Sequence, residues 1–200
     1  MEFPLWLTNN YLEVFGAVTG IIFVLLEIRQ NIWLWPLGIL TSGTYIWVFF
    51  TNKFYADMSL QGYYLAISIL GWYWWTRHRE GDEDRHELVV TRLKFRTGAY
   101  IAIAFILMFA GLWFVLEKFT DSPVPIYDSF ITSLSIVATW MLARKIFEHW
   151  YLWIIVNGVS AIVFLSRGLI PTLVLYTVYC IMSFAGIIEW KKSLINRKVQ

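Results

Sequence analysis

The sequence predicts an all-α integral membrane protein with seven transmembrane helices in a 3+1+3 arrangement, in which parallel three-helix repeats flank one unpaired helix. Three observations support this fold class. Hydrophobic residues make up 58% of the 200 residues and charged residues only 15%, whereas soluble domains have about 45–50% and about 25%. Seven apolar runs are long enough to cross a bilayer, and the first three recur in the last three.

The apolar runs define the expected helices in order. A bilayer core of about 30 Å requires roughly 20 helical residues. Runs near this length occupy 11–28, 32–50, 58–75, 98–116, 127–143, 150–165 and 172–190. Residues 1–10 lack the basic segment and the small-residue cleavage site of a signal peptide, so we expect a short interfacial segment that is retained. Residues 77–97 carry charges of both signs and predict a solvated connecting loop, and 191–200 form a basic tail.

An internal repeat relates the first three runs to the last three. A shift of 115 residues aligns them without a gap and gives thirteen identities between positions 21 and 75, where biased composition would give roughly four by chance. Shared hydrophobicity alone would not keep arginine, tryptophan, tyrosine and glycine in one register. The identities include Trp35/Trp150, Tyr64/Tyr179, Ser68/Ser183, Gly71/Gly186 and Trp75/Trp190.

The repeat has a consequence for topology. Three helices end on the membrane face opposite to where they began, so one further helix must cross back before the repeat recurs in the same orientation. The run at 98–116 has no mate and is expected to be that helix. The predicted domains are a first repeat at 11–76, a linker helix and loop at 98–126 and a second repeat at 127–190. Transporters built from parallel repeats hold substrate near mid-membrane between the halves, so this plan predicts a transporter.

The distribution of Lys and Arg predicts the orientation. Thirteen of the sixteen lie on the side that includes the 77–97 loop and the C-terminal tail, and three lie on the other. Because positive residues accumulate on the cytoplasmic side, we expect the C-terminus inside and the N-terminus outside.

The charged residues also exclude several function classes. The net charge of +2 is too small for a nucleic-acid partner. One cysteine, Cys180, excludes an internal disulfide and a multi-cysteine zinc site. Every carboxylate and histidine falls near an expected helix end or in a loop, which disfavours ion-coupled pumping. No Gly-rich phosphate loop, HExxH or nucleophile–base pair is present, so we expect no enzyme activity, no metal and no cofactor.

The sixth helix carries the first candidate site. Trp150, Trp153 and Asn157 are spaced three and four apart and therefore share one helical face. An asparagine in mid-span must find a partner, so Asn157 is either a solute ligand or a helix–helix hydrogen bond. Trp150 lies at a helix end, as its repeat mate Trp35 does, and by itself fits an interfacial belt better than a solute contact. Trp153 is one turn deeper and is the better solute contact.

The third and seventh helices carry further candidates. Gln61 is a second amide within a span, which also fits a purely packing role. Its repeat mate is Tyr176, and the mate of Tyr64 is Tyr179. Trp47 and Ser42, the mate of Asn157, are weaker candidates. Aromatic faces beside amides and hydroxyls suit a flat heteroaromatic, and a cationic ring adds about 0.5–2 kcal/mol per good cation–π contact. Since no Arg or Lys faces the spans to hold a phosphate, we expect an unphosphorylated, nucleoside-like or vitamin-like solute.

Several stretches carry a family resemblance along nearly the whole chain. They are LEVFGAVTGII in the first run, FYADMSLQ and GWYWW around the third, YDSF and LSIVA in the fifth, and ARKIFEHWYLWIIVN with its WxxWxxxN pattern. In these motifs the chain resembles the PnuC-type vitamin transporters, whose best-known members carry nicotinamide riboside and whose architecture is related to the SWEET sugar transporters.

The resemblance implies an energy-independent facilitator in a bacterial inner membrane, working by alternating access, with a cytoplasmic kinase trapping the vitamin by phosphorylation. It implies substrate contacts at Trp150, Trp153, Asn157 and Gln61, and a homo-oligomer such as a trimer. It also implies relatives that carry thiamine or riboflavin, so a thiamine transporter stays open beside nicotinamide riboside. A membrane receptor or scaffold without transport is the alternative from another class.

Overall fold

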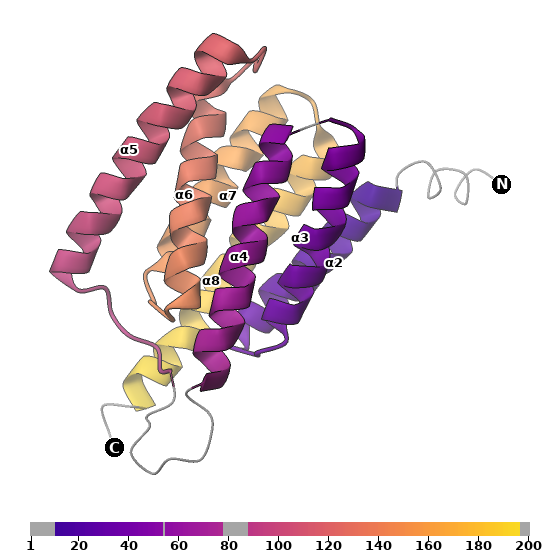
Figure 1. Ribbon diagram of the computed structural model, residues 1–200. Helices are drawn as coiled ribbons and strands as arrows, with labels where there is room; N and C mark the ends of the chain where they lie inside the picture. The colour runs from indigo at the N-terminus through magenta and orange to yellow at the C-terminus, as the bar shows by residue number, and fades with distance from the viewer. Residues whose placement is uncertain (1–10, 54, 78–87, 197–200) are drawn as a thin grey trace. The chain divides into compact units, whose positions relative to one another are not determined.

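The structure is a computed structural model, which describes residues 11–53, 55–77 and 88–196. These residues form seven helices, coloured by residue number in Figure 1. The helices are α2 (Tyr11–Ile28), α3 (Leu34–Thr51), α4 (Tyr55–Arg77), α5 (Phe95–Phe119), α6 (Pro125–Ala143), α7 (His149–Ser166) and α8 (Ile170–Asn196). Each expected helix is confirmed to within a few residues, apart from α8, which continues six residues further into the tail. The expected interfacial segment at 1–10 lies outside the described residues, as do loop residues 78–87 and tail residues 197–200.

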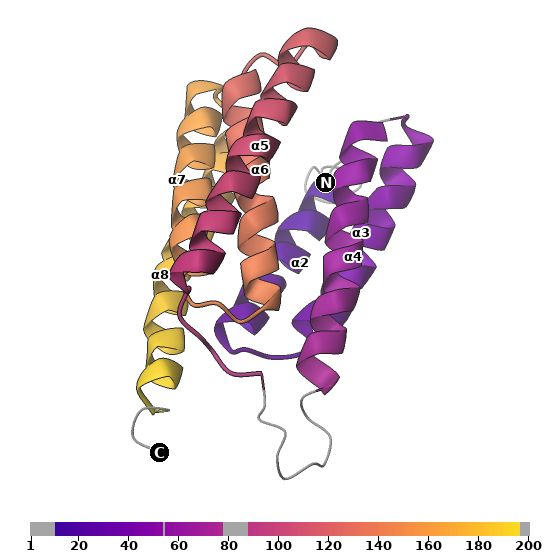
Figure 2. The same ribbon diagram turned by 60° about the vertical axis from the view of Figure 1, so that its left-hand side comes forward.

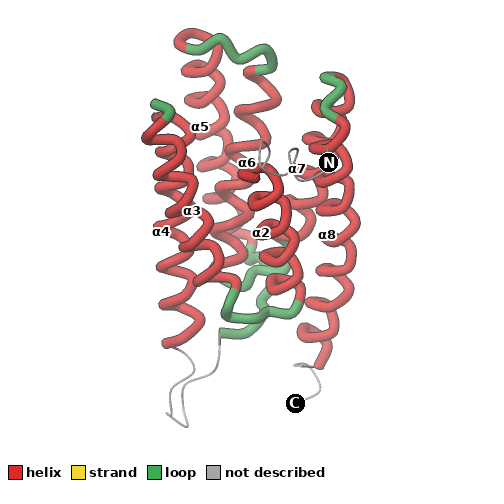
Figure 3. Tube along the Cα trace, turned by 90° about the vertical axis from the view of Figure 1, so that its right-hand side faces the viewer, coloured by secondary structure: helices red, strands yellow, loops and turns green. Residues whose placement is uncertain are grey.

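Length and hydropathy qualify five of the described helices as membrane spans: α3, α5, α6, α7 and α8. The apolar part of α2 counts as a shorter helix over Val14–Ile28. Helix α4 is long enough, at 23 residues, but it carries Asp57, Ser59 and Gln61 near its start. The described residues are otherwise loops and turns, shown in green in Figure 3. The order of the helices is compatible with the 3+1+3 plan.

The chain divides into two compact units, Met1–Asp82 and Glu83–Gln200. In the first unit, α3 packs against both α2 and α4. The Trp35 side chain is fully buried and lies on Gly71, where a Cβ would overlap its ring. Its ring also meets Trp75 edge to face, with the centroids 5.4 Å apart.

In the second unit, α6 packs against α5 and α7, and α7 packs against α8. The views in Figures 1 and 2 agree that α5 runs alongside α6. Here Trp150 is buried on Gly186 and meets Trp190 edge to face at 5.8 Å. Trp150, Gly186 and Trp190 are the repeat mates of Trp35, Gly71 and Trp75, in that order. We call each arrangement a Trp–Gly joint: Trp35 on Gly71, and Trp150 on Gly186. Their presence at matching positions supports the repeat inferred from the sequence.

Helix α5 is the helix without a mate. Phe105 and Phe109 both meet Phe130 of α6 edge to face, at 5.7 and 6.3 Å. None of its 25 residues, all of which the structure describes, is buried. An apolar helix with so much uncovered surface is typical of a membrane span.

Part of the expected solvated loop is instead held against the second unit. Thr91 exchanges backbone hydrogen bonds with the α6–α7 turn: its N–H donates to the Lys145 carbonyl, and its carbonyl accepts from the Phe147 N–H, both at 2.9 Å. The Leu93 N–H donates to Glu148 Oε2 at 2.8 Å. Val90 is only 4% exposed. We call residues 90–94 the docked segment. The prediction of a fully solvated loop is therefore wrong for this stretch, because its backbone bonds to the α6–α7 turn and Val90 is buried.

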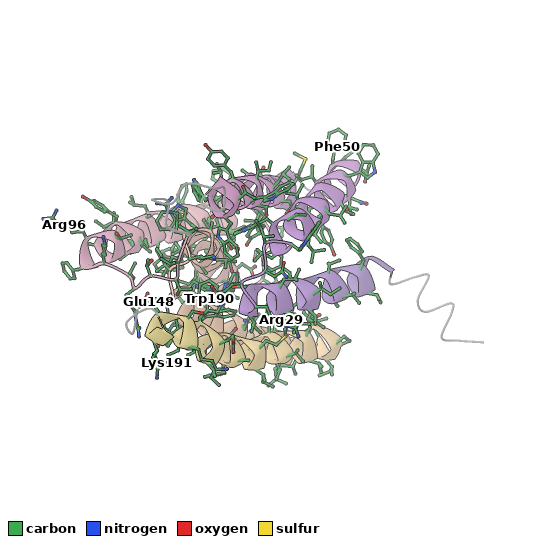
Figure 4. The ribbon with its side chains drawn as sticks, turned by 90° about the horizontal axis from the view of Figure 1, so that it is seen from below. Arg29, Phe50, Arg96, Glu148, Trp190 and Lys191 are labelled. Carbon is green, nitrogen blue, oxygen red and sulfur yellow. The ribbon has the colours of Figure 1, made fainter. Side chains whose placement is uncertain are left out.

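Side chains reinforce this docking. Arg92 pairs with Glu148 Oε1 at 3.3 Å, and its guanidinium lies 4.6 Å from the centre of the Phe147 ring. Figure 4 labels Glu148 and Trp190 at this end of the second unit. The His149 ring lies with its centre 4.6 Å from the centre of the Trp190 ring. These contacts hold the α6–α7 turn in place, and the turn in turn fixes the position of the first residues of α7.

Candidate functional site

The candidate site begins on α7, where the docked α6–α7 turn and the Trp–Gly joint hold the start of the helix. Asn157 is 6% exposed and Trp153 is partly buried. The indole nitrogen of Trp153 is buried and has no hydrogen-bond partner among the described residues. A buried donor without a partner is costly, so Trp153 has unused hydrogen-bonding capacity beside a mid-helix amide.

Asn157 makes the helix–helix hydrogen bond that the sequence left open. Its Nδ2 donates to Ser183 Oγ of α8 at 3.3 Å, and that hydroxyl in turn donates to the Tyr179 carbonyl at 2.8 Å. An asparagine amide offers two donor hydrogens and an acceptor oxygen, so one long bond uses only part of its capacity. The packing role and a ligand role are therefore compatible in this residue.

Two tyrosines of α8 stand near the same face. The Tyr176 and Tyr179 rings meet edge to face at 5.9 Å, and Tyr176 lies 5.1 Å from the Phe164 ring of α7. Cys180 directly follows Tyr179 and lies against α7, with its Sγ 4.0 Å from the Ile154 carbonyl oxygen. The α7–α8 pair thus combines aromatic faces with an amide and hydroxyls, which is the chemistry expected from the sequence.

Trp150 differs from what its position at a helix end indicated. It is 1% exposed, so an interfacial belt position is wrong. Its ring packs on α8, which approaches closely at Gly186 and presents Trp190 edge to face. Its indole nitrogen is buried without a partner among the described residues. Trp150 therefore orients α7 in this structure, and its direct contact with solute stays a prediction.

The candidates of the first unit lie on α3 and α4. Gln61 and Tyr64 are partly buried, and Tyr64 meets the Tyr63 ring at 5.5 Å. Ser42 is 4% exposed and Trp47 is 68% exposed, so within this unit the tryptophan is not enclosed. By the sequence register, Gln61 and Tyr64 are the repeat mates of Tyr176 and Tyr179.

Sequence reasoning missed three residues of the second unit. Phe164 packs on Tyr176 as described above. Ser133 of α6 and Ser160 of α7 are both 0% exposed, and neither hydroxyl has a partner among the described residues. The signal for Ser160 was present, since it follows Trp153 by seven residues and shares its face. Among the described residues, no three His, Cys, Asp or Glu side chains are grouped so that they could hold a metal ion.

Comparison with known proteins gives concordant results. The family model described as nicotinamide mononucleotide transporter matches residues 10–192. The nicotinamide riboside transporter PnuC of Escherichia coli is 24% identical over 210 residues, covering 94% of this chain and 88% of that protein. The riboflavin/roseoflavin transporter RibM of Streptomyces davaonensis is 26% identical over 180 residues, covering 89% and 83%.

One solved structure shares the fold. The crystal structure of the vitamin B3 transporter PnuC matches with a TM-score of 0.73 and 24% identity, covering 96% of this chain and 85% of that one. This likeness confirms the all-helical transporter fold predicted from the sequence.

Proposed function

The chain belongs to the nicotinamide mononucleotide transporter family, and from this premise we propose that it carries nicotinamide riboside across the membrane. Membership makes the protein a PnuC-type vitamin transporter and not an enzyme, as the motifs predicted. We propose the vitamin, the transport mechanism and the binding residues from the chemistry of the candidate site.

The observation that carries the proposal is that Trp153 and Asn157 lie one turn apart on the same face of α7. A pyridinium ring gains cation–π attraction against tryptophan or tyrosine faces. A carboxamide on that ring can form two hydrogen bonds with an asparagine amide. The Asn157 side chain makes one hydrogen bond, from Nδ2 to Ser183 Oγ, so it can form others. Gln61 and Tyr64 on α4 are proposed as further contacts, together with Tyr176 and Tyr179; Trp47 is retained as the weakest candidate.

The charges favour the riboside over the mononucleotide. Among the residues that the structure describes, every Lys and Arg lies in a loop or within two turns of a helix end. Tight binding of a phosphate group calls for charge-assisted hydrogen bonds, typically from Arg or Lys. The α7–α8 face offers neutral donors only, so we expect the mononucleotide to bind more weakly than the riboside.

The mechanism we propose is facilitated diffusion by alternating access, in which cytoplasmic phosphorylation then traps the vitamin. The relatives' names and the apolar helices support a multi-pass protein of a bacterial inner membrane. The distribution of Lys and Arg supports an outside N-terminus and a cytoplasmic C-terminus. The homotrimer implied by the family resemblance stays a proposal as well.

A competition experiment tests the substrate. Protein in liposomes takes up labelled nicotinamide riboside while unlabelled riboside, thiamine, riboflavin or nicotinamide mononucleotide is added outside. We expect the riboside to compete best and the mononucleotide poorly. Stronger competition by the mononucleotide would contradict the proposal, and so would binding without uptake, which indicates a receptor. Collapsing a proton gradient should leave the final accumulation unchanged.

Riboflavin is the second candidate substrate because one relative with 26% identity is named as a riboflavin/roseoflavin transporter. Thiamine shares the cationic ring that favours nicotinamide riboside, so it remains in the same panel. The competition order decides among the three.

A further inference from the structure

Two serine hydroxyls in the second unit are buried and make no hydrogen bond to any described residue. Ser133 of α6 and Ser160 of α7 are each 0% exposed, and neither oxygen has a hydrogen-bond partner among the described residues. The other buried hydroxyls of this unit donate to the carbonyl four residues earlier, at 2.6–2.8 Å. These others are Ser129, Ser135, Thr139 and Ser183.

The two exceptions lie at the same depth. At about 1.5 Å per residue, Ser133 is about 15 Å from the end of α6 at Ala143, and Ser160 is about 16 Å from the start of α7 at His149. The two helices are neighbours joined by a short turn, so they run antiparallel and these distances are measured from the same end. Half of a bilayer core of about 30 Å is a similar distance, which places both hydroxyls near mid-membrane.

Ser160 also continues the candidate site. Trp153, Asn157 and Ser160 follow one another at intervals of four and three residues, so they share one face of α7 over two turns. The exposed residues of α7 point away from this face; they are Tyr151, Ile155, Ile162, Leu165 and Ser166. Ser160 is therefore one turn deeper than Asn157 on the inward face.

The repeat shows that the fold does not require serine at either place. The mate of Ser133 is Val18, which is 50% exposed, and the mate of Ser160 is Tyr45. A three-helix unit with the same Trp–Gly joint thus forms with an aliphatic and an aromatic residue there. A buried hydroxyl without a partner lowers stability, so its presence in the second unit calls for another explanation.

We infer that Ser133 and Ser160 hold the hydroxyl groups of a polyol substituent on the substrate, such as the ribose of a nucleoside, beyond the ring held at Trp153 and Asn157. This rests on the function proposed above. A hydroxyl both donates and accepts hydrogen bonds, so two serines match a sugar that also presents both. Neither serine has exposed surface here, so substrate meets them in an open state of the transport cycle.

The test compares two ligands that differ by the sugar. Titrations measure the affinity of Ser133→Ala and Ser160→Ala for nicotinamide riboside and for nicotinamide. We expect each change to weaken riboside binding roughly threefold to tenfold, the effect of one hydrogen bond, and to leave nicotinamide binding unchanged. The melting temperature should not fall, because alanine removes an unsatisfied buried hydroxyl.

Ser129→Ala is the matched control. Ser129 is also 0% exposed on α6, but its hydroxyl already donates to the Pro125 carbonyl at 2.6 Å. The Ser129→Ala variant should therefore bind nicotinamide riboside and nicotinamide with unchanged affinity. Equal riboside affinity in the Ser133 and Ser160 variants, or equal weakening of both ligands, overturns the inference while the proposed function stands. If the unaltered protein fails to bind the riboside, the proposed function fails and the inference fails with it.

Discussion

The two three-helix repeats share a joint and differ in chemistry one turn away. Trp35 on Gly71 and Trp150 on Gly186 have the same geometry, down to the edge-to-face contacts with Trp75 and Trp190. One turn further along α3 and α7 the residues diverge. The first repeat has Gly38 at this position, where an added Cβ would lie only 2.7 Å from Ser68 Oγ, so a side chain does not fit. The second repeat has Trp153 at the matching position.

The same divergence continues at the next turn. Ser42 in the first repeat corresponds to Asn157 in the second, which reaches Ser183, the mate of Ser68. The lesson is that the joint maintains helix packing in both repeats, while α7 alone carries a large aromatic residue and an amide where α3 carries small residues.

Removing the α7 aromatic should have the largest effect on binding. Trp153→Ala is expected to weaken the affinity for nicotinamide riboside by about 2 kcal/mol or more, roughly thirtyfold, because it removes an aromatic face and a donor. Titration of the purified protein measures this. Trp113→Ala on α5, where the side chain is 43% exposed, is the control. Equal losses in both variants would contradict the assignment of the site to α7.

The joints should prove equally intolerant in both repeats. Gly71→Ala and Gly186→Ala each force a methyl group into a tryptophan ring, and overpacking of this kind costs about 1–3 kcal/mol. Thermal unfolding should show a lower melting temperature for both variants. Gly43→Ala and Gly158→Ala are controls from the neighbouring helices, because nothing lies within 4 Å of the added Cβ. If only one joint were sensitive, the structural equivalence of the repeats would be wrong.

Exchanging one residue between repeats sharpens the comparison. Asn157→Ser gives the second repeat the residue of the first, and it should weaken riboside binding by about 1 kcal/mol, the value of a hydrogen bond. Ser42→Asn, the reverse change, should leave binding unchanged. Affinity and melting temperature are measured together. A fall in melting temperature without a loss of affinity would assign Asn157 to packing alone.

The smallest effect is expected at the turn before α7. Glu148 holds the docked segment through Leu93 N–H and Arg92, whereas its repeat mate is Trp33, which is 67% exposed. Glu148→Gln removes a partly exposed ion pair and should lower stability by less than about 1 kcal/mol. Hydrogen exchange should quicken in residues 90–94. Glu189→Gln, which breaks an exposed pair with Lys192, should leave exchange there unchanged. Loss of uptake in Glu148→Gln would show that the docked segment serves transport directly.

Much of the fold could be predicted because its determinants are local. The length of an apolar run sets the length of a span, so α2 was placed at 11–28, the same bounds that the structure gives. The repeat register placed the joint residues at matching positions, whereas their contacts became visible only in the structure. The docked segment could not be predicted, because its charges indicate solvent and only pairing with the distant α6–α7 turn overrides them. Trp150 was misplaced at the interface for the same reason: its neighbour Trp190 is 40 positions away.

For the candidate site, helical spacing by itself determined that Trp153 and Asn157 share a face, since 3.6 residues per turn is a property of the backbone. It also determined that an amide and aromatic rings, rather than charges, would be available there. Only the tertiary structure decided which buried hydroxyls already make a hydrogen bond within the protein. Ser129 and Ser133 stand one turn apart on the same helix, yet the first bonds to its own backbone and the second does not. That choice depends on the rotamer allowed by neighbouring helices, and no local pattern in the chain encodes it.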